Sequence, residues 1–292
     1  MKYPVIVRLQ GGLGNQLYQY ATGRAVAKRF GCPMFLDKRT IEPEAPARHY
    51  NLGVFNIQEN FVKGYLAWMT RWVGSVRLGK YFTTFWLPAR NFHYLRDSEM
   101  GYDSRLFEDH AGPIALLGYW QCYRHFDSIS NELRGELTFK QGPVGKNRDM
   151  MDELQSCNSV GVHVRRGDYT NFTQSLGLCD AGYYQKATQH LQLQIENPKF
   201  YVFTDDPHWA HTDLNLGGAP FQVVDHNLGQ ADYEDMRLMS NCRHLIIANS
   251  SFSWWGAWLA NHPGKIVIAP KNWFVHDEVP AEDRVPSAWL RM

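Results

Sequence analysis

The chain has 292 residues, of which 44% are hydrophobic and 20% are charged, and its formal net charge at pH 7 is +1. This composition excludes a disordered chain, and the length is enough for one large or two medium domains. The balanced charge argues against a nucleic-acid-binding protein, which usually carries a basic excess or a basic stripe.

The N-terminal segment predicts a β-α-β unit. Pro4–Leu9 is an apolar run typical of a short buried strand, and Met34–Asp37 has the pattern of a second one. Between them, Gln16–Phe30 suits a helix with Asn15 as its N-cap and Gly31 just past its end. Small residues along this helix would let it lie close to the strands.

The next part of the chain is harder to interpret. From Tyr50 to Phe107, short helical patterns rich in aromatic residues alternate with glycine breaks. Ile114–Phe126 has the pattern of a buried strand and its exit, and a helix with Asp127 as a cap is expected after it. The polar segment Lys140–Asp149 contains two glycines and a proline, which is typical of a domain boundary.

The C-terminal half alternates strands and helices, which predicts a parallel, doubly wound sheet. With the boundary above, we expect an N-terminal domain at 1–145 and a C-terminal domain at 146–292. The fold class expected is α/β, with two Rossmann-like domains facing a cleft. The predicted strands cover 159–164, 199–206, 221–225, 245–250 and 265–270. The predicted helices cover 180–197 (capped by Asp180), 207–214, 230–244 and 251–261.

Cysteines and apolar runs bear on location. The cysteines are scattered and odd in number, with no C-x-x-C pair, so neither a disulfide framework nor a zinc site is expected. The first apolar run is too short for a signal peptide, and no run approaches the ~20 residues of a membrane span. A cytoplasmic protein fits best. The five cysteines are Cys32, Cys122, Cys157, Cys179 and Cys242.

The predicted strand at 159–164 ends in the motif HVRRGDY. His163 and Arg165 point to the same side of a strand, and adjacent arginines entering a glycine turn suit an anion grip, because guanidinium donors match phosphate oxygens. Asp168 is a candidate to orient an arginine or to act as a base. The bland alternative is a surface salt bridge of little energetic weight. The position at a strand end favours a function.

A second cluster lies where the predicted strand at 245–250 ends. Asn249, Ser250 and Ser251 stand directly before a helix, where hydroxyls and free N–H groups form an anion cradle. An ordinary helix cap is the alternative. Because two such clusters lie at strand ends of one predicted sheet, we favour phosphate binding.

Three acids open the predicted helix at 230–244. Asp232, Glu234 and Asp235 would stabilise the helix dipole, which is the bland interpretation for most of them. One of them could instead accept hydrogen bonds from N1–H and the amino group of guanine. No cluster has the ligands of a catalytic zinc site, and Asp205-Asp206 is not a D-x-D motif, so no metal site is expected.

The turn after the first strand, GGLGNQ, could hold a phosphate. The dinucleotide fingerprint needs a third glycine, but Leu17 stands there, and a P-loop lysine is also missing. Asp37 lies where a ribose-binding acid would stand, but without the third glycine we consider an NAD-binding oxidoreductase unlikely. The turn is better explained as a close approach of backbone to a ligand, with Asn15 at the helix start.

Taken together, four motifs resemble those of the bacterial α-1,2-fucosyltransferases of glycosyltransferase family 11. They are GGLGNQLYQYATGRAVA, VGVHVRRGDY, YVFTDD and LMSNCRHLIIANSSFSWWGAWLA. The resemblance runs from near residue 5 to near 275, and the combination is specific although each motif alone is not. It implies a GT-B-type fold and inverting, metal-independent transfer of L-fucose from GDP-β-L-fucose to the 2-hydroxyl of a terminal β-galactose. No cofactor is implied, since GDP-fucose is the donor substrate.

The resemblance also implies residue roles. Arg165 would bind the pyrophosphate and stabilise departing GDP, Asn15 would reach the fucose and pyrophosphate, and Asp168 is the candidate base. Asp235 matches by spacing the guanine-reading Asp of the wider superfamily. The residues expected at the donor are Gly14, Asn15, His163, Arg165, Arg166, Asp235, Asn249, Ser250, Ser251 and Phe252.

The expected partners are GDP-fucose and a galactose-terminated glycan or O-antigen unit bound by the N-terminal half, with no nucleic acid. Trp68, Arg71, Trp72 and Arg77 could form a surface for a lipid-linked acceptor and hold the protein peripherally at the inner membrane, but a core helix is the simpler interpretation. A glycan or nucleotide-sugar binding protein without turnover is the alternative function. The acceptor itself is not readable.

Overall fold

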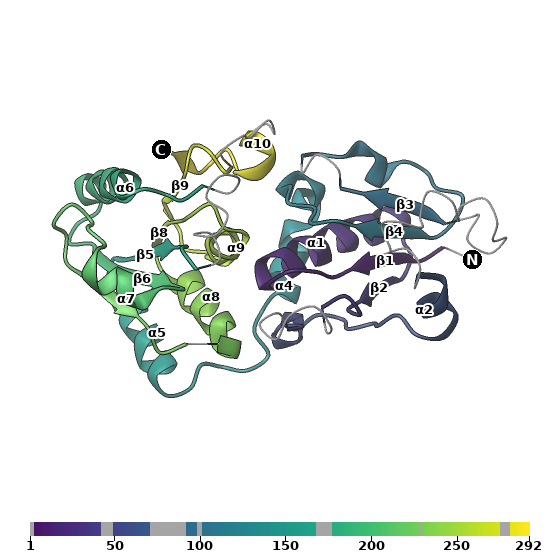
Figure 1. Ribbon diagram of the computed structural model, residues 1–292, viewed down its shortest axis with the longest axis horizontal. Helices are drawn as coiled ribbons and strands as arrows, with labels where there is room; N and C mark the ends of the chain where they lie inside the picture. The colour runs from purple at the N-terminus through teal and green to yellow at the C-terminus, as the bar shows by residue number, and fades with distance from the viewer. Residues whose placement is uncertain are drawn as a thin grey trace. The chain divides into compact units, whose positions relative to one another are not determined.

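The computed structural model describes residues 3–41, 49–70, 92–97, 101–167, 177–227, 229–274 and 281–292. The chain forms two compact units, Met1–Glu136 and Leu137–Met292, called here the N-terminal and C-terminal units (Figure 1). In its described part, each unit is built on one parallel sheet flanked by helices. The predicted α/β class with two Rossmann-like domains is therefore confirmed.

In the described part of the N-terminal unit, four parallel strands lie in the order β2-β1-β4-β3. Val5 on β1 pairs with Met34 on β2 and with Ile114 on β4. The strands are β1 (Val5–Arg8), β2 (Met34–Asp37), β3 (His93–Arg96) and β4 (Ile114–Leu117). The α-helices are α1 (Leu13–Phe30), α2 (Gly64–Thr70) and α4 (Ser130–Glu136). Short 3-10 helices are η1 (Leu52–Val54), η3 (Ser104–Phe107), η4 (Tyr123–His125) and η5 (Asp127–Ile129).

Helix α1 packs tightly on β1. A Cβ on Gly23 would lie 2.2 Å from Val7 Cγ2, so the missing side chain permits the close approach that small residues predicted. The helix ends at Gly31, whose φ of 57° is left-handed and whose N–H donates to Ala27 O and Lys28 O. The predicted C-terminus of this helix is confirmed.

Two predicted caps are wrong. Helix α1 begins at Leu13 with Gly12 as its N-cap, and Gly12 O accepts from Asn15 N at 3.0 Å, so Asn15 lies inside the first turn. A glycine in extended conformation opens this helix without a side-chain oxygen. Asp127 lies inside η5, whose N-cap is Phe126.

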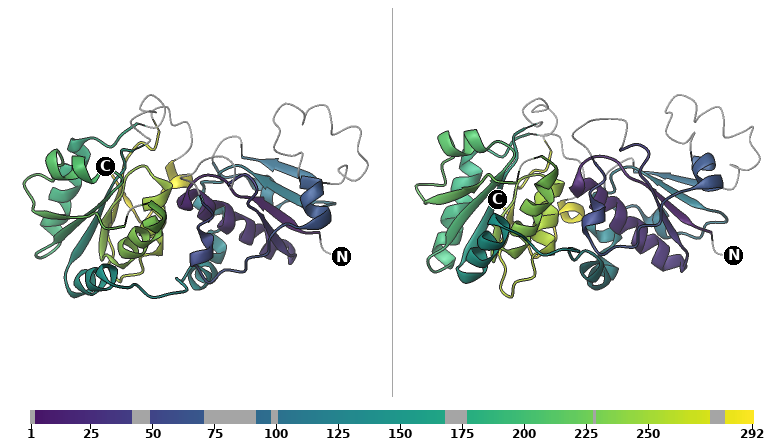
Figure 2. Two further views of the ribbon diagram at one scale, coloured as in Figure 1. Left: turned by 60° about the horizontal axis from the view of Figure 1, so that its bottom comes forward. Right: turned by 90° about the horizontal axis from the view of Figure 1, so that it is seen from below.

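In the described part of the C-terminal unit, six parallel strands lie in the order β10-β9-β8-β5-β6-β7. Figure 2 shows helices on both sides of this sheet. The strands are β5 (Ser159–Val164), β6 (Lys199–Thr204), β7 (Phe221–Val224), β8 (His244–Ile246), β9 (Val267–Ala269) and β10 (Leu290–Arg291). The helices are α5 (Lys146–Ser156), α6 (Ala181–Gln194), α7 (Pro207–Thr212), η7 (Gly229–Ala231), α8 (Asp232–Asn241), α9 (Ser251–Leu259) and α10 (Ala281–Arg284).

The predicted alternation of this half is confirmed, with a few additions. Asp180 caps α6, and its Oδ1 accepts from Tyr183 N at 2.7 Å. Helix α5 was not predicted, because the glycines and proline of 140–149 suggested a linker, and Gly145 with φ 54° is in fact its N-cap. The short elements α10 and β10 were also not predicted.

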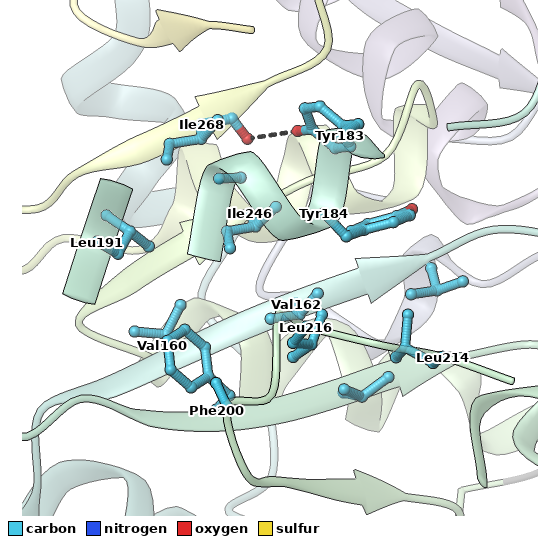
Figure 3. Packing of buried hydrophobic residues seen from close by; sticks show 14 of the residues in the cluster. Val160, Val162, Tyr183, Tyr184, Leu191, Phe200, Leu214, Leu216, Ile246 and Ile268 are labelled. Atoms are coloured by element: carbon cyan, nitrogen blue, oxygen red, sulfur yellow. Dashed lines mark hydrogen bonds between the residues drawn. The ribbon is translucent and has the colours of Figure 1, made fainter. Parts of the chain in front are cut away.

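Figure 3 shows the core between α6 and the central strands. Val160 and Val162 on β5 pack with Leu191 on α6 and Phe200 on β6, and all of them are buried. The Tyr183 hydroxyl donates to Ile268 O at 3.1 Å, so the polar atom of this buried ring is satisfied. This packed core lies against β5, β6 and β8, whose ends carry the residues described next.

No helix in the described part of the chain is long and apolar enough to cross a membrane. Helix α2 ends at Thr70, and Arg71, Trp72 and Arg77 lie outside the described residues, as does the side chain of Trp68. The predicted membrane surface therefore stays a prediction.

Candidate functional site

The candidate site lies at the carboxyl edge of the C-terminal sheet. Because β5, β6, β7 and β8 are parallel, the residues that follow them gather along one edge. The strand register shows which residues meet there, since Val164 at the end of β5 pairs with Thr204 at the end of β6. The next residues, Arg165 and Asp205, are therefore neighbours.

Arg165 is held by Asp205. Its Nη1 lies 3.1 Å from Asp205 Oδ2, and both side chains are about a quarter exposed. The other carboxylate oxygen, Oδ1, accepts from Arg166 N at 2.8 Å. A Cβ on Gly167 would lie 2.3 Å from Asp205 Oδ2, so the glycine leaves the space that this carboxylate occupies. Asp205 thus fixes both the guanidinium and the turn of the RRG segment.

Arg166 is engaged differently from Arg165. Its guanidinium carbon lies 4.0 Å from the centre of the Trp209 ring on α7, and its Nε lies 3.6 Å from Asp206 Oδ2. Asp206 also caps α7 by accepting from Trp209 N at 3.1 Å. The two arginines of the predicted grip are therefore tied to different acids.

Sequence reasoning missed the role of Asp205, which it considered only for metal binding. The alternation of strands contained the signal, because aligning the ends of β5 and β6 puts this acid beside the arginines. Asp168, the predicted orienting residue or base, lies outside the described residues.

His163 is buried on β5 beside the arginine. It is 4% exposed, and its ring centre lies 5.6 Å from that of Phe252 in the first turn of α9. Burial, and then the positive charge of Arg165, lower the pKa of His163 to about 3, so the imidazole is neutral at pH 7. Within the described residues its Nδ1 has no hydrogen-bond partner. The structure brings His163, Arg165 and Phe252 together as predicted.

The segment after β8 contains one side chain that fixes neighbouring loops and two serines at the start of α9. The Asn249 amide donates to Trp273 O at 2.9 Å, and its Oδ1 accepts from Cys179 Sγ at 3.6 Å, so this side chain fixes neighbouring loops. Ser250 is the N-cap of α9, but its hydroxyl makes no capping hydrogen bond. Ser251 is the first residue of that helix. Ser250 therefore stands at the cap position, as the alternative of an ordinary helix cap predicts, but its hydroxyl does not cap the helix.

The three acids at the start of α8 have different partners. Glu234 Oε2 lies 2.8 Å from Arg237 Nε, which makes it a buried structural ion pair. Asp235 instead accepts from the neutral amide of Asn227, from Nδ2 to Oδ1 at 2.8 Å. Burial, with repulsion from Asp232 and Glu234, raises the pKa of Asp235 to about 7, although the Asn227 hydrogen bond acts to lower it. Glu234 is therefore structural, and Asp235 is better suited than Glu234 to a ligand.

The predicted residues of the N-terminal unit lie at the start of α1. Asn15 Oδ1 accepts from Gln121 Nε2 at 2.7 Å, and a Cβ on Gly11 would lie 2.5 Å from Asn15 Nδ2. The glycine turn and the segment after β4 therefore hold the Asn15 amide in place. Gly14 is buried inside the first turn.

Asp37 is not free for a ribose. Its carboxylate accepts from Arg39 Nε and Nη2, each at 2.7 Å, and lies 3.5 Å from Arg8 Nη2. An acid enclosed by two arginines does not match a ribose-binding acid, which adds to the argument against an NAD-binding enzyme.

Comparison with known proteins decides the family. The glycosyl transferase family 11 model matches residues 3–291. The chain belongs to glycosyl transferase family 11. An α-1,2-colitosyltransferase of Escherichia coli is 35% identical over 296 residues, covering 99% of this chain and 98% of the relative. The galactoside 2-α-L-fucosyltransferase Sec1 of Mus musculus is 25% identical and covers 87% of this chain and 63% of its own length.

Solved structures agree on the architecture of this family 11 enzyme. A mutant FUT1 of Arabidopsis thaliana in complex with GDP matches 97% of this chain and 73% of its own, with a TM-score of 0.55 at 12% identity. NodZ α-1,6-fucosyltransferase co-crystallized with GDP matches 92% of this chain and 95% of its own, with a TM-score of 0.54 at 17% identity. The fold is that of the GT-B-like fucosyltransferases.

Proposed function

We propose that this protein transfers L-fucose from GDP-β-L-fucose to the 2-hydroxyl of a terminal β-galactose, with inversion of the anomeric centre and without a metal ion. Family 11 membership and its 2-fucosyltransferase relatives support the reaction. The observation that carries the donor site is Arg165, fixed by Asp205 at the carboxyl edge of the C-terminal sheet. GDP-fucose is the donor substrate, and no further cofactor is proposed.

The reaction is a single displacement. The oxygen of the galactose 2-hydroxyl forms a bond to the anomeric carbon as the bond from that carbon to the GDP oxygen breaks. GDP leaves with the bonding electrons, and the hydroxyl proton passes to a base or to water. Attack on the face opposite the nucleotide converts the β-linked donor into an α-linked product.

Arg165 stabilises the departing nucleotide. Negative charge grows on the β-phosphate as the bond breaks, so a positioned guanidinium stabilises the transition state more than the ground state. The bond from Asp205 orients the guanidinium before the substrate arrives. His163 is neutral beside this arginine and adds no competing positive charge. Arg166, Ser250, Ser251 and Phe252 are proposed to line the nucleotide, with Asn249 supporting their loop.

Asp168 is the proposed base. Sequence analysis left two roles for it, orientation of Arg165 or proton acceptance, and Asp205 already performs the first. Asp235 is proposed to read guanine. Gly14 and Asn15 are proposed to approach the fucose and pyrophosphate from the N-terminal unit, where the Asn15 amide is held by Gln121.

Colitosyl transfer is the second candidate function. It is favoured by the 35% identity to an α-1,2-colitosyltransferase over nearly the full length of both chains. Colitose is L-fucose without its 3-hydroxyl, so the two donors differ by a single group. A site that hydrogen-bonds this hydroxyl would reject the analogue that lacks it. An O-antigen unit is the proposed acceptor class, since another relative of Escherichia coli is the O-antigen biosynthesis glycosyltransferase WbnK. A cytoplasmic location, with peripheral contact at the inner membrane through a lipid-linked acceptor, belongs to the same proposal.

Release of free GDP tests this function. The protein is mixed with GDP-fucose or GDP-colitose and each of a panel of β-galactosides, including lactose and galactosyl-N-acetylhexosamines. We expect acceptor-dependent GDP release, faster with GDP-fucose. Faster release with GDP-colitose would move the assignment to colitosyl transfer, and binding of the donor without release for any acceptor would favour a binding protein.

A further inference from the structure

A chain of hydrogen-bonded side chains leads to Asp235 from two other elements. Asn147 in the first turn of α5 and Asn227 just after β7 exchange two amide hydrogen bonds, Asn147 Nδ2 to Asn227 Oδ1 at 2.8 Å and Asn227 Nδ2 to Asn147 Oδ1 at 2.9 Å. Asn227 Nδ2 also donates to Asp235 Oδ1 at 2.8 Å. His226 Nε2 lies 2.8 Å from Asn147 Oδ1. This set of four side chains is called the amide relay below.

The side-chain amides of the amide relay have only one orientation that satisfies their hydrogen bonds. Asn227 uses both N–H bonds of Nδ2, one to Asn147 and one to Asp235, and its oxygen is already an acceptor. Turning the Asn227 amide over would put its oxygen against the carboxylate. Asn147 Oδ1 also accepts a hydrogen bond from His226 Nε2. This nitrogen of the imidazole must therefore carry the proton. Burial, and then the charge of Lys146, lower the pKa of His226 and favour the neutral ring.

We propose that Asn227, backed by Asn147, is a positioning residue that favours the ionised form of Asp235 and aims it to accept from the N1–H and amino group of a guanine base. The inference rests on the proposed GDP-sugar donor, and it deepens that proposal by naming what supplies base specificity. A neutral amide anchors one carboxylate oxygen without neutralising the charge that the base must meet.

Electrostatics explain why such an anchor is needed. Asp235 is half-buried and shares its helix turn with two more acids, Asp232 and Glu234, all of which disfavours its ionised form. Glu234 is paired with Arg237, and Asp225 and Lys146 lie toward His226 at the far end of the relay. The group that donates to Asp235 itself is Asn227, so this amide favours the carboxylate that guanine needs.

Calorimetry of GDP binding from pH 5.5 to 8.5 tests the proposal on the full-length protein. In the wild type, affinity should rise as Asp235 ionises, with a midpoint close to the pKa of about 7 that the structure assigns to it. Asp235→Asn supplies the baseline, because it keeps the shape and removes the titrating carboxyl, so any remaining pH dependence comes from other groups such as the phosphate and His226. Inosine diphosphate, which lacks the amino group, measures the base contact directly.

Asn227→Ala is the decisive variant. Loss of its N–H donor disfavours the carboxylate, so the midpoint should move up by about one pH unit and GDP should bind about fivefold more weakly at pH 7. Near pH 8.5 its affinity should approach that of the wild type. Asn147→Ala should shift the midpoint in the same direction by less. A merely structural role would weaken binding equally at every pH.

Asn241→Ala is the matched control. Asn241 accepts from Gln155 Nε2 at 3.0 Å, so it also joins α5 to α8 through a pair of side-chain amides, but at the other end of α8. It should leave both affinity and midpoint unchanged. If Asn227→Ala has the midpoint of the wild type while Asp235→Asn still weakens GDP, the relay is wrong and the donor site stands. Unchanged GDP affinity in Asp235→Asn would overturn the base contact itself.

A different result would overturn the proposed transfer reaction. A wild type that binds GDP with the expected pH dependence but releases none from GDP-fucose or GDP-colitose would overturn the enzymatic function and leave the amide relay supported.

Discussion

The carboxyl edges of the two sheets carry similar residues in different electrostatic states. At the ends of β1 and β2 of the N-terminal unit, the buried Asp37 lies between Arg8 and Arg39, and its oxygens are satisfied within the protein. After β5 and β6 of the C-terminal unit, Arg165 and Asp205 are paired but about a quarter exposed. Arginine and aspartate at strand ends therefore do not by themselves mark a ligand site.

The difference teaches how to separate scaffold from site. A buried carboxylate whose two oxygens are both bonded by arginines holds its unit together, and removing its charge leaves the buried Arg8 uncompensated. A pair that water still reaches, beside a neutral buried histidine, is suited to meet a ligand. Substitution at the two edges should therefore change different quantities.

The largest effect is expected for Arg165→Ala. Turnover should fall by about 10²- to 10³-fold or more, because a preorganised donor to the leaving phosphate is lost. The melting temperature should change little, since the side chain is partly exposed. Arg165→Lys should recover only part of the rate, because an ammonium lacks the planar fork of donors. Wild-type turnover in Arg165→Ala would remove this residue from the phosphate site.

Asp37→Asn should act on stability instead. Loss of the buried carboxylate between two arginines should cost about 3 kcal/mol in the free energy of unfolding, measured by urea titration. Burial alone would raise the pKa of Asp37, but hydrogen bonds and charge from Arg39, followed by the charge of Arg8, hold it below its usual value. Its stabilisation is therefore present above the ordinary carboxyl pKa and is lost as the pH falls through the lowered value.

The pH dependence of stability distinguishes this interpretation. Asp37→Asn should flatten the acid side of the stability profile relative to the wild type. Equal stability of the two proteins at pH 7 would mean that the N-terminal edge is not a structural ion cluster, and the contrast between the two edges would fail.

Asp205→Asn should reduce turnover by about tenfold, less than loss of the arginine itself. The amide keeps one acceptor for Arg166 N but loses the charge that aims Arg165. Gly167→Ala should have a similar effect, because its Cβ would displace the same carboxylate. Steady-state kinetics with both substrates checks both variants, and full activity in each would show that Arg165 needs no orienting partner.

The smallest effect is expected for metal removal. With Arg165 as the charge that stabilises departing GDP, turnover should be unchanged in excess EDTA. A loss of activity that Mn²⁺ or Mg²⁺ restores would contradict metal independence.

Much of the C-terminal unit was predictable from the sequence. Strand β5 was predictable from its apolar period and β-branched residues, and the Asp180 cap of α6 from its side-chain oxygen. Both signals are local in the sequence. Helices opened by glycine backbone were misjudged, as at Gly12 before α1 and Gly145 before α5, because no side chain announces them.

Only part of the site was predictable, because only some of its residues leave a local pattern in the sequence. Arg165 and His163 stand at the end of a recognisable strand and were found. Asp205 became visible only through the register of β5 against β6, and Asn227 and Asn147 meet from segments 80 residues apart. Partners brought together by tertiary structure leave no local pattern, so the residues that orient the chemistry are harder to find than those that perform it.

The most direct test of the central claim is NMR analysis of the product made from GDP-β-L-fucose and a β-galactoside. We predict an α-linked fucose on the 2-hydroxyl of the terminal galactose, made by the wild type and nearly absent with Arg165→Ala. A fucose on another hydroxyl, a β-linked product, or equal product from the variant would contradict the account.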